Sequence, residues 1–119
     1  RGGATPADLL CAALAASQDS ALRLAAARHG VRIASLGVEV TSAVDVRGAL
    51  GAEDDVPVGF QALHSTVRIE TAPDTSAQAL RQVLADADRA CIVLATLRRA
   101  LPVYVRIQHQ TPAPLALAA

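Results

Sequence analysis

Four consecutive polar residues, Ser17-Gln18-Asp19-Ser20, follow a nearly apolar run over residues 7–16, ADLLCAALAA, in which Asp8 is the one charged side chain. A helix that is apolar on every side is expected to be buried on every side. Polar groups that follow such a run must be hydrogen-bonded or line a cavity, because an unpaired buried polar group costs about 1–3 kcal/mol. Residues 17–20 are therefore where we expect chemistry.

The two cysteines, Cys11 and Cys91, are the other candidates for chemistry, and they form neither a C-x-x-C motif nor a metal-type cluster. Two cysteines are too few for a disulfide framework, which favours a reducing cytoplasm. Cys11 precedes Ser17 by six residues, about 240° around a helix, so the two cannot share one pocket. We interpret Cys11 as a packing residue, with a relocated reactive thiol as the alternative.

The remaining ionisable groups predict no metal, cofactor or nucleic-acid site. His29, His64 and His109 lack the spacing of metal ligands. The acidic residues 53–55 are interpreted as a solvated loop, and Arg98-Arg99 as the end of a short helix rather than a nucleic-acid patch. The formal net charge of +0 argues against nucleic acid and anionic membranes as partners.

No apolar run reaches the roughly 18–20 residues of a membrane span, and residues from Arg1 onward show no signal-peptide pattern. We therefore expect a cytoplasmic protein that does not enter membranes. The chain opens at Arg1 and contains no methionine, so we also expect a processed or trimmed chain, or the ordered part of a longer one.

A long helix over residues 6–29 should carry the polar cluster. Thr5 can cap it, Pro6 suits its first position, and Asp8 completes a capping box. Gly30 supplies the stop. Asp19 can pair with Arg23 four residues later, as in an ordinary helix salt bridge.

The rest of the chain contains segments with the two-residue period of strands and segments with the 3.6-residue period of helices. Period-two alternation predicts strands over residues 36–47 and 60–71, separated by a long loop over residues 48–59. After the two strands, Thr75 is expected to cap a helix that ends near Cys91. A shorter helix is expected over residues 92–99. Val103, Val105 and Ile107 alternate after Pro102 and predict a last strand.

This order, α-β-β-α-α-β, indicates an α+β fold in one domain over residues 1–110, with a loose tail over residues 111–119. Three strands cannot cover a helix that is apolar all round. We therefore expect further strands from a missing N-terminal segment, a partner chain, or both.

Several of these segments resemble motifs of the OsmC/Ohr family of thiol-dependent hydroperoxide reductases. Residues 5–10 and 12–17 resemble the family's helix motif, T-x-P-x-x-L-L followed by A-A-L-A-A-C. Residues 91–97, CIVLATL, resemble its second cysteine motif, C-P-V-x-x-T-L. Residues 45–48 with 56–60 resemble its middle strand and loop, and residues 102–105 its last strand.

The resemblance implies an OsmC-like fold, in which a long central helix packs on antiparallel sheets in an intertwined homodimer. It also implies a bacterial, cytoplasmic protein of oxidative-stress defence. In the family, a cysteine on the central helix attacks the peroxide, and a second cysteine then forms a disulfide with it. One branch adds an arginine from an early strand and a glutamate at the start of the central helix.

This sequence departs from the family at that site. Ser17 occupies the position of the attacking cysteine, Ala7 that of the glutamate, and no early strand supplies the arginine. Cys91 alone keeps the position of the resolving cysteine, with plain packing as the alternative. A serine hydroxyl is not a usable peroxide nucleophile at neutral pH, so we expect this chain to lack peroxidase activity as it stands.

Three interpretations of Ser17 stay open: an engineered replacement of cysteine, a natural loss in a non-catalytic relative, or an ordinary helix serine. An engineered serine would imply organic hydroperoxides as substrates and a thiol reductant as partner. A natural one favours a non-enzymatic dimeric scaffold, or a binder of a small apolar ligand. In both cases the expected partner is a second copy of the chain.

Overall fold

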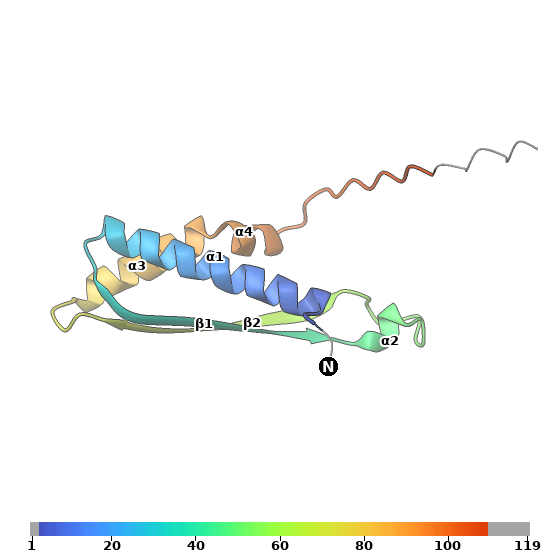
Figure 1. Cartoon of the computed structure of the whole chain (residues 1–119), viewed down its shortest axis with the longest axis horizontal. Helices are drawn as coiled ribbons and strands as arrows, with labels where there is room; N and C mark the ends of the chain where they lie inside the picture. Colours follow the sequence, from blue (N-terminus) through green and yellow to red (C-terminus); the bar gives the residue numbers. More distant parts are fainter. Residues whose placement is uncertain (1–2, 110–119) are drawn as a thin grey trace, which may run out of the picture.

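The long helix α1 (Pro6–Arg28) lies along one face of a β-hairpin in the computed structural model, which describes residues 3–109 (Figure 1). The hairpin strands are β1 (Ile33–Val44) and β2 (Phe60–Thr71), with the short helix α2 (Val46–Ala49) between them. Helices α3 (Ala77–Ala90) and α4 (Ile92–Leu97) follow and lie beside α1. The predicted α+β class is confirmed.

Local signals set both ends of α1. The Asp8 N–H donates to Thr5 Oγ1 at 3.1 Å and the Thr5 N–H donates to Asp8 Oδ2 at 3.0 Å, which completes the predicted capping box. His29 caps the other end, and Gly30 follows with a φ of +68°, a left-handed conformation that favours glycine. The prediction for residues 6–29 is therefore confirmed to within one residue.

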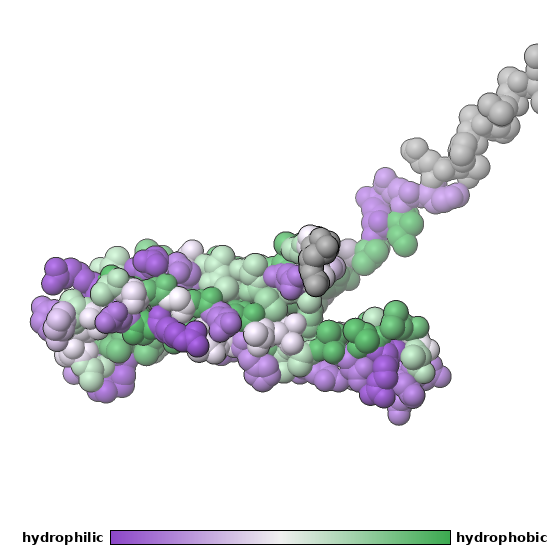
Figure 2. Space-filling view, turned by 60° about the horizontal axis from the view of Figure 1, so that its bottom comes forward, coloured by the Kyte–Doolittle hydropathy of each residue, from purple (hydrophilic) through white to green (hydrophobic). Residues whose placement is uncertain are grey.

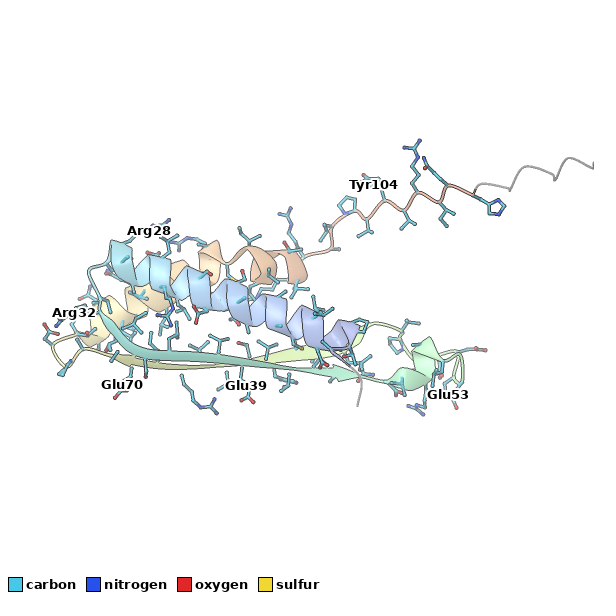
Figure 3. The ribbon with its side chains drawn as sticks, in the orientation of Figure 1. Arg28, Arg32, Glu39, Glu53, Glu70 and Tyr104 are labelled. Carbon is cyan, nitrogen blue, oxygen red and sulfur yellow. The ribbon has the colours of Figure 1, made fainter. Side chains whose placement is uncertain are left out.

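The hairpin is antiparallel, with Val38 opposite Val67 near its centre. Leu36, Val38 and Val67 are half-buried and pack against the helices, whereas Glu39 and Glu70 point away from them (Figure 3). The sheet thus presents an apolar face to α1 and a polar face to solvent, as the period-two alternation predicts.

The first strand ends at Val44, earlier than its sequence pattern predicts, because residue 45 caps a helix. The Asp45 side chain accepts a hydrogen bond from the Arg47 N–H at 3.1 Å and caps α2. The strand prediction for residues 45–47 is therefore wrong, and α2 also occupies the start of the predicted loop. Gly48 lies so close to the returning chain that a Cβ would stand 2.6 Å from the Val56 carbonyl oxygen.

The two later helices differ from prediction only at their ends. Ser76, rather than Thr75, caps α3, since its side chain accepts from the Ala79 N–H at 3.0 Å. The break falls at Cys91, as predicted, where an extended backbone ends α3 and begins α4. The shorter helix ends at Leu97, two residues before the predicted end.

The core lies between the C-terminal half of α1, α3 and the sheet. Its buried members are small or medium apolar residues: Leu22, Ala25, Ala26, Val83 and Ala87. The N-terminal half of α1 is covered on one side only, where Leu14 is buried, while Leu9 is 62% exposed. The prediction that residues 7–16 are buried on every side is therefore wrong for the single chain.

The predicted last strand is also wrong. Residues 100–109 have no regular secondary structure and lead away from the helices, with Tyr104 90% exposed (Figures 1 and 3). A strand needs a neighbouring strand to satisfy its backbone, and within residues 3–109 the sheet holds β1 and β2 alone. The tail predicted over residues 111–119 lies outside the described residues.

Candidate functional site

Ser17 and Cys91, separated by 73 residues of sequence, lie side by side, with Ser17 Oγ and Cys91 Sγ 3.1 Å apart. Ser17 is carried by the middle of α1, and Cys91 by the junction between α3 and α4. The structure thus brings together the two residues that the sequence singled out at the two cysteine positions.

The backbone around Cys91 positions the pair. Cys91 has φ −76° and ψ 112°, an extended conformation that turns the chain between two helices and leaves its side chain 1% exposed. The Val93 N–H in the first turn of α4 donates to Ser17 Oγ at 3.3 Å. Since the first N–H groups of a helix have no partner within it, Ser17 satisfies a donor that would otherwise be left over.

The pair has limited chemistry with these side chains. Either the hydroxyl or the thiol can donate in the Ser17–Cys91 contact. Neither Cys91 nor the Val93 amide is a general base that could take the hydroxyl proton. An activated serine needs such a base within hydrogen-bond reach, so the geometry does not favour serine nucleophilic catalysis.

The polar cluster of residues 17–20 divides its contacts among three elements. Ser17 reaches α4, whereas Gln18 reaches the sheet, where its Oε1 accepts from Ser65 Oγ of β2 at 2.6 Å. Asp19 stays on the helix and pairs with Arg23 at 2.8 Å, the predicted i,i+4 salt bridge. Ser20 is exposed. The cluster therefore joins α1 to its neighbours on two sides.

An apolar groove of about 670 Å³ lies next to this cluster, between α1, β2 and α4. A smaller cavity of about 200 Å³ shares Gln18, Val67 and Leu94 with the groove and reaches Cys91. The groove is lined by Leu10, Leu14, Gln18, Phe60, Gln61, Ala62, Leu63, Ser65, Val67, Leu94, Leu97 and Arg98. Its volume is typical of small-molecule sites.

Arg98 is the one charged residue among those that line the groove. Its Nη1 donates to Asp88 Oδ2 at 2.9 Å, and Asp88 lines the smaller cavity. This hydrogen bond raises the pKa of Arg98 above its usual value, so the guanidinium is charged at every working pH. The ion pair therefore joins a residue from the groove to a residue from the cavity beside Cys91.

A family model for OsmC-like proteins matches residues 1–106 of the chain. The chain belongs to the OsmC-like protein family. The resemblance carried by residues 5–17 and 91–97 is thereby confirmed at the level of the family.

Two solved structures share the OsmC-like fold of this chain. An OsmC-like protein from Mycoplasma pneumoniae matches with a TM-score of 0.69 and 19% identity, over 82% of this chain and 64% of its own. An OsmC-like hydroperoxide resistance protein from Jannaschia sp. CCS1 matches with a TM-score of 0.68 and 21% identity, over 92% of this chain and 71% of its own. A comparison with curated protein sequences finds no match.

The other predicted residues of the OsmC-like chain lie away from the Ser17–Cys91 pair. Cys11 is a half-buried free thiol in a shallow hollow of about 430 Å³ that also includes Asp8 and Val40. Ala7 occupies the first turn of α1 and carries no group for chemistry. His29 binds Asp86 on α3, and within residues 3–109 no three potential ligands lie close enough to hold a metal ion.

Sequence reasoning missed Arg98, which it assigned only to a helix end. Cys91, Leu94 and Arg98 follow one another at intervals of three and four, the spacing of one helix face. That spacing could have placed Arg98 on the same side as the cysteine.

Within the described residues, no helix has the length and apolar character needed to span a membrane.

Proposed function

We propose that this OsmC-like chain keeps the two-residue site of the thiol-dependent hydroperoxide reductases, with Ser17 in place of the attacking cysteine and Cys91 as the resolving one. The 3.1 Å contact between Ser17 Oγ and Cys91 Sγ is the observation that carries this proposal. A thiol at position 17 would stand within bonding reach of Cys91 after a small side-chain rotation. With serine there, we expect no peroxidase activity.

The surroundings of position 17 also suit a thiolate. The Val93 N–H, which donates to Ser17 Oγ, would donate to a sulfur anion at the same place. Hydrogen bonds to the charged form of an acid lower its pKa, and only the thiolate attacks peroxides. A cysteine introduced at position 17 would therefore meet one of the requirements of a reactive thiol.

The expected reaction of the Ser17→Cys variant has three steps. The introduced thiolate attacks one peroxide oxygen, an S–O bond forms, the O–O bond breaks, and an alcohol leaves after protonation. The Cys91 thiol then attacks the resulting sulfenic acid, an S–S bond forms and water leaves. An external dithiol supplies two electrons and two protons to restore both thiols.

The test compares Ser17→Cys with Ser20→Cys, the same change three residues along α1 at an exposed position. Each variant is given cumene hydroperoxide and dithiothreitol, and hydroperoxide consumption is measured. From Ser17→Cys alone we expect turnover with dithiothreitol and, after hydroperoxide treatment without dithiothreitol, an internal disulfide, visible as a loss of two hydrogens by mass spectrometry. Absence of both from a folded Ser17→Cys variant would overturn the proposal.

The site would lie in a homodimer. The N-terminal half of α1 leaves Leu9 62% exposed, and Leu24 further along is 54% exposed. Together with the cover that α1 lacks over its N-terminal half, these exposed leucines support a contact with a second copy of the chain. Sedimentation of the chain measures its mass directly. We expect a dimer that Leu9→Asp dissociates, and a monomeric wild-type chain would contradict the assignment.

The groove favours a second function, the binding of a small apolar ligand without catalysis. Eight of its twelve lining residues are apolar: Leu10, Leu14, Phe60, Ala62, Leu63, Val67, Leu94 and Leu97. Native mass spectrometry of the purified chain, with and without an added alkyl compound, tests this function. An empty groove under all these conditions would count against it.

A further inference from the structure

The single charge on the groove suggests what a ligand would carry. Ligand pockets are mostly apolar, with a few polar groups that fix orientation. Here Arg98 is the one charged residue of the lining, and no lining residue is acidic. Arg98 is paired with Asp88 through Nη1, and a neutral apolar molecule would use the aliphatic walls but not the guanidinium donors outside that pair. An anion with an apolar tail would use both.

We propose that the groove binds a single-chain alkyl carboxylate, with its head group on Arg98 and its chain against the leucines of α1 and α4. This inference rests on the ligand-binding function proposed above and adds the charge of the ligand. Guanidinium presents five N–H donors in a planar arrangement that matches a carboxylate. Asp88 occupies Nη1, so the remaining donors stay available.

The environment of Arg98 would let a ligand carboxylate exchange with the carboxylate of Asp88. The side chains of Arg98 and Asp88 are 60% and 55% exposed, so solutes can reach the pair. Leu94 precedes Arg98 by one helical turn and lines the same groove. A head group on Arg98 would therefore continue directly into the apolar part of the groove.

An Asp88 variant tests the proposal, because the two possible roles of Arg98 predict opposite changes in ligand affinity. If the Arg98–Asp88 pair were only structural, Arg98→Gln and Asp88→Asn would both break it and would change ligand affinity in the same direction. If Arg98 holds the head group, Asp88 competes with the ligand. Arg98→Gln should then weaken binding roughly threefold to tenfold, and Asp88→Asn should strengthen it.

The experiment measures binding of dodecanoate and of 1-dodecanol to the whole chain and its variants, by displacement of a fluorescent alkyl probe. Arg99→Gln serves as the matched control, because Arg99 is the exposed next residue and does not line the groove. We expect dodecanoate to bind more tightly than the alcohol, a preference that Arg98→Gln abolishes and Arg99→Gln keeps. Unfolding curves establish that each variant is folded.

Each remaining outcome overturns a distinct statement. Equal affinity for acid and alcohol in the wild-type chain would overturn the role of Arg98 and leave the ligand-binding function standing. Failure of both compounds to bind would overturn the inference and the ligand-binding function together. Binding that falls as the chain dimerises, measured by sedimentation in the same samples, would show that a second copy fills the groove and would overturn the inference.

Discussion

His29, which caps the C-terminal end of α1, binds Asp86 of α3 through its Nε2, and Arg89 binds the other oxygen of the same carboxylate. This three-residue group joins the end of α1 to the C-terminal half of α3, and both helices enclose the core. The hydrogen bond from His29, followed by that from Arg89, lowers the pKa of Asp86 below its ordinary value of 3.8.

The lowered pKa of Asp86 predicts a loss of stability in acid. A carboxyl whose pKa is lower in the folded state stabilises the fold fully above its unfolded-state pKa. That contribution disappears as pH falls through the folded-state pKa. We expect Asp86→Asn to be less stable than wild type near pH 7, and we expect the difference in urea unfolding to shrink as pH falls below 3.8, the ordinary pKa of this carboxyl. Asp54→Asn, in an exposed loop, is the control, and a difference that is independent of pH would contradict the prediction.

Ser17→Ala and Ser20→Ala form a matched pair on α1. Alanine favours the helix at both positions by up to about 0.5 kcal/mol. Only Ser17 also loses its contacts with the Val93 N–H and Cys91 Sγ. We expect Ser17→Ala to be less stable than Ser20→Ala by about 1 kcal/mol in urea unfolding. Equal stabilities would mean that the contact contributes nothing.

Gly48→Ala should destabilise the end of the hairpin. A Cβ at this position would lie 2.5 Å from the Pro57 carbonyl oxygen, so the returning chain must move. Overpacking of this kind costs about 1–3 kcal/mol. Gly59→Ala is the control, because its Cβ would meet nothing within 4 Å. Similar midpoints of thermal unfolding for the two variants would refute the close approach.

Leu22→Ala tests where the core lies. Leu22 is 4% exposed among α1, α3 and the sheet, so its truncation should cost about 2–5 kcal/mol. Leu50→Ala removes the same atoms at a position that is 78% exposed and should cost less than about 0.5 kcal/mol. Guanidinium unfolding of both variants gives the comparison. A small effect of Leu22→Ala would place the core elsewhere.

The sequence predicts those features that depend on near neighbours. Thr5, Asp8 and Gly30 set the ends of α1 through contacts within one turn, so the helix is predicted to within a residue. The family resemblance pointed to Ser17 and Cys91, although 73 residues separate them. Alternation at residues 103–107 could not show whether a partner strand exists, because pairing is a long-range property.

The same limit explains why the arginine on the groove was missed. Arg98 and Asp88 are ten residues apart, and the break at Cys91 decides that they meet. A charge near a helix end is usually explained by the helix itself. Its place on a groove depends on β2 and α1, which approach it from distant parts of the chain.

The extended segment after α4 bears on how the chain behaves in concentrated solution. Val103, Val105 and Ile107 are 77%, 79% and 86% exposed along one alternating stretch. Figure 2 adds a second hydrophobic surface on the projecting end of the hairpin, where Val46 and Leu50 are exposed. Without a cover for that stretch, we expect self-association through its exposed apolar side chains on storage, which Val105→Glu should suppress.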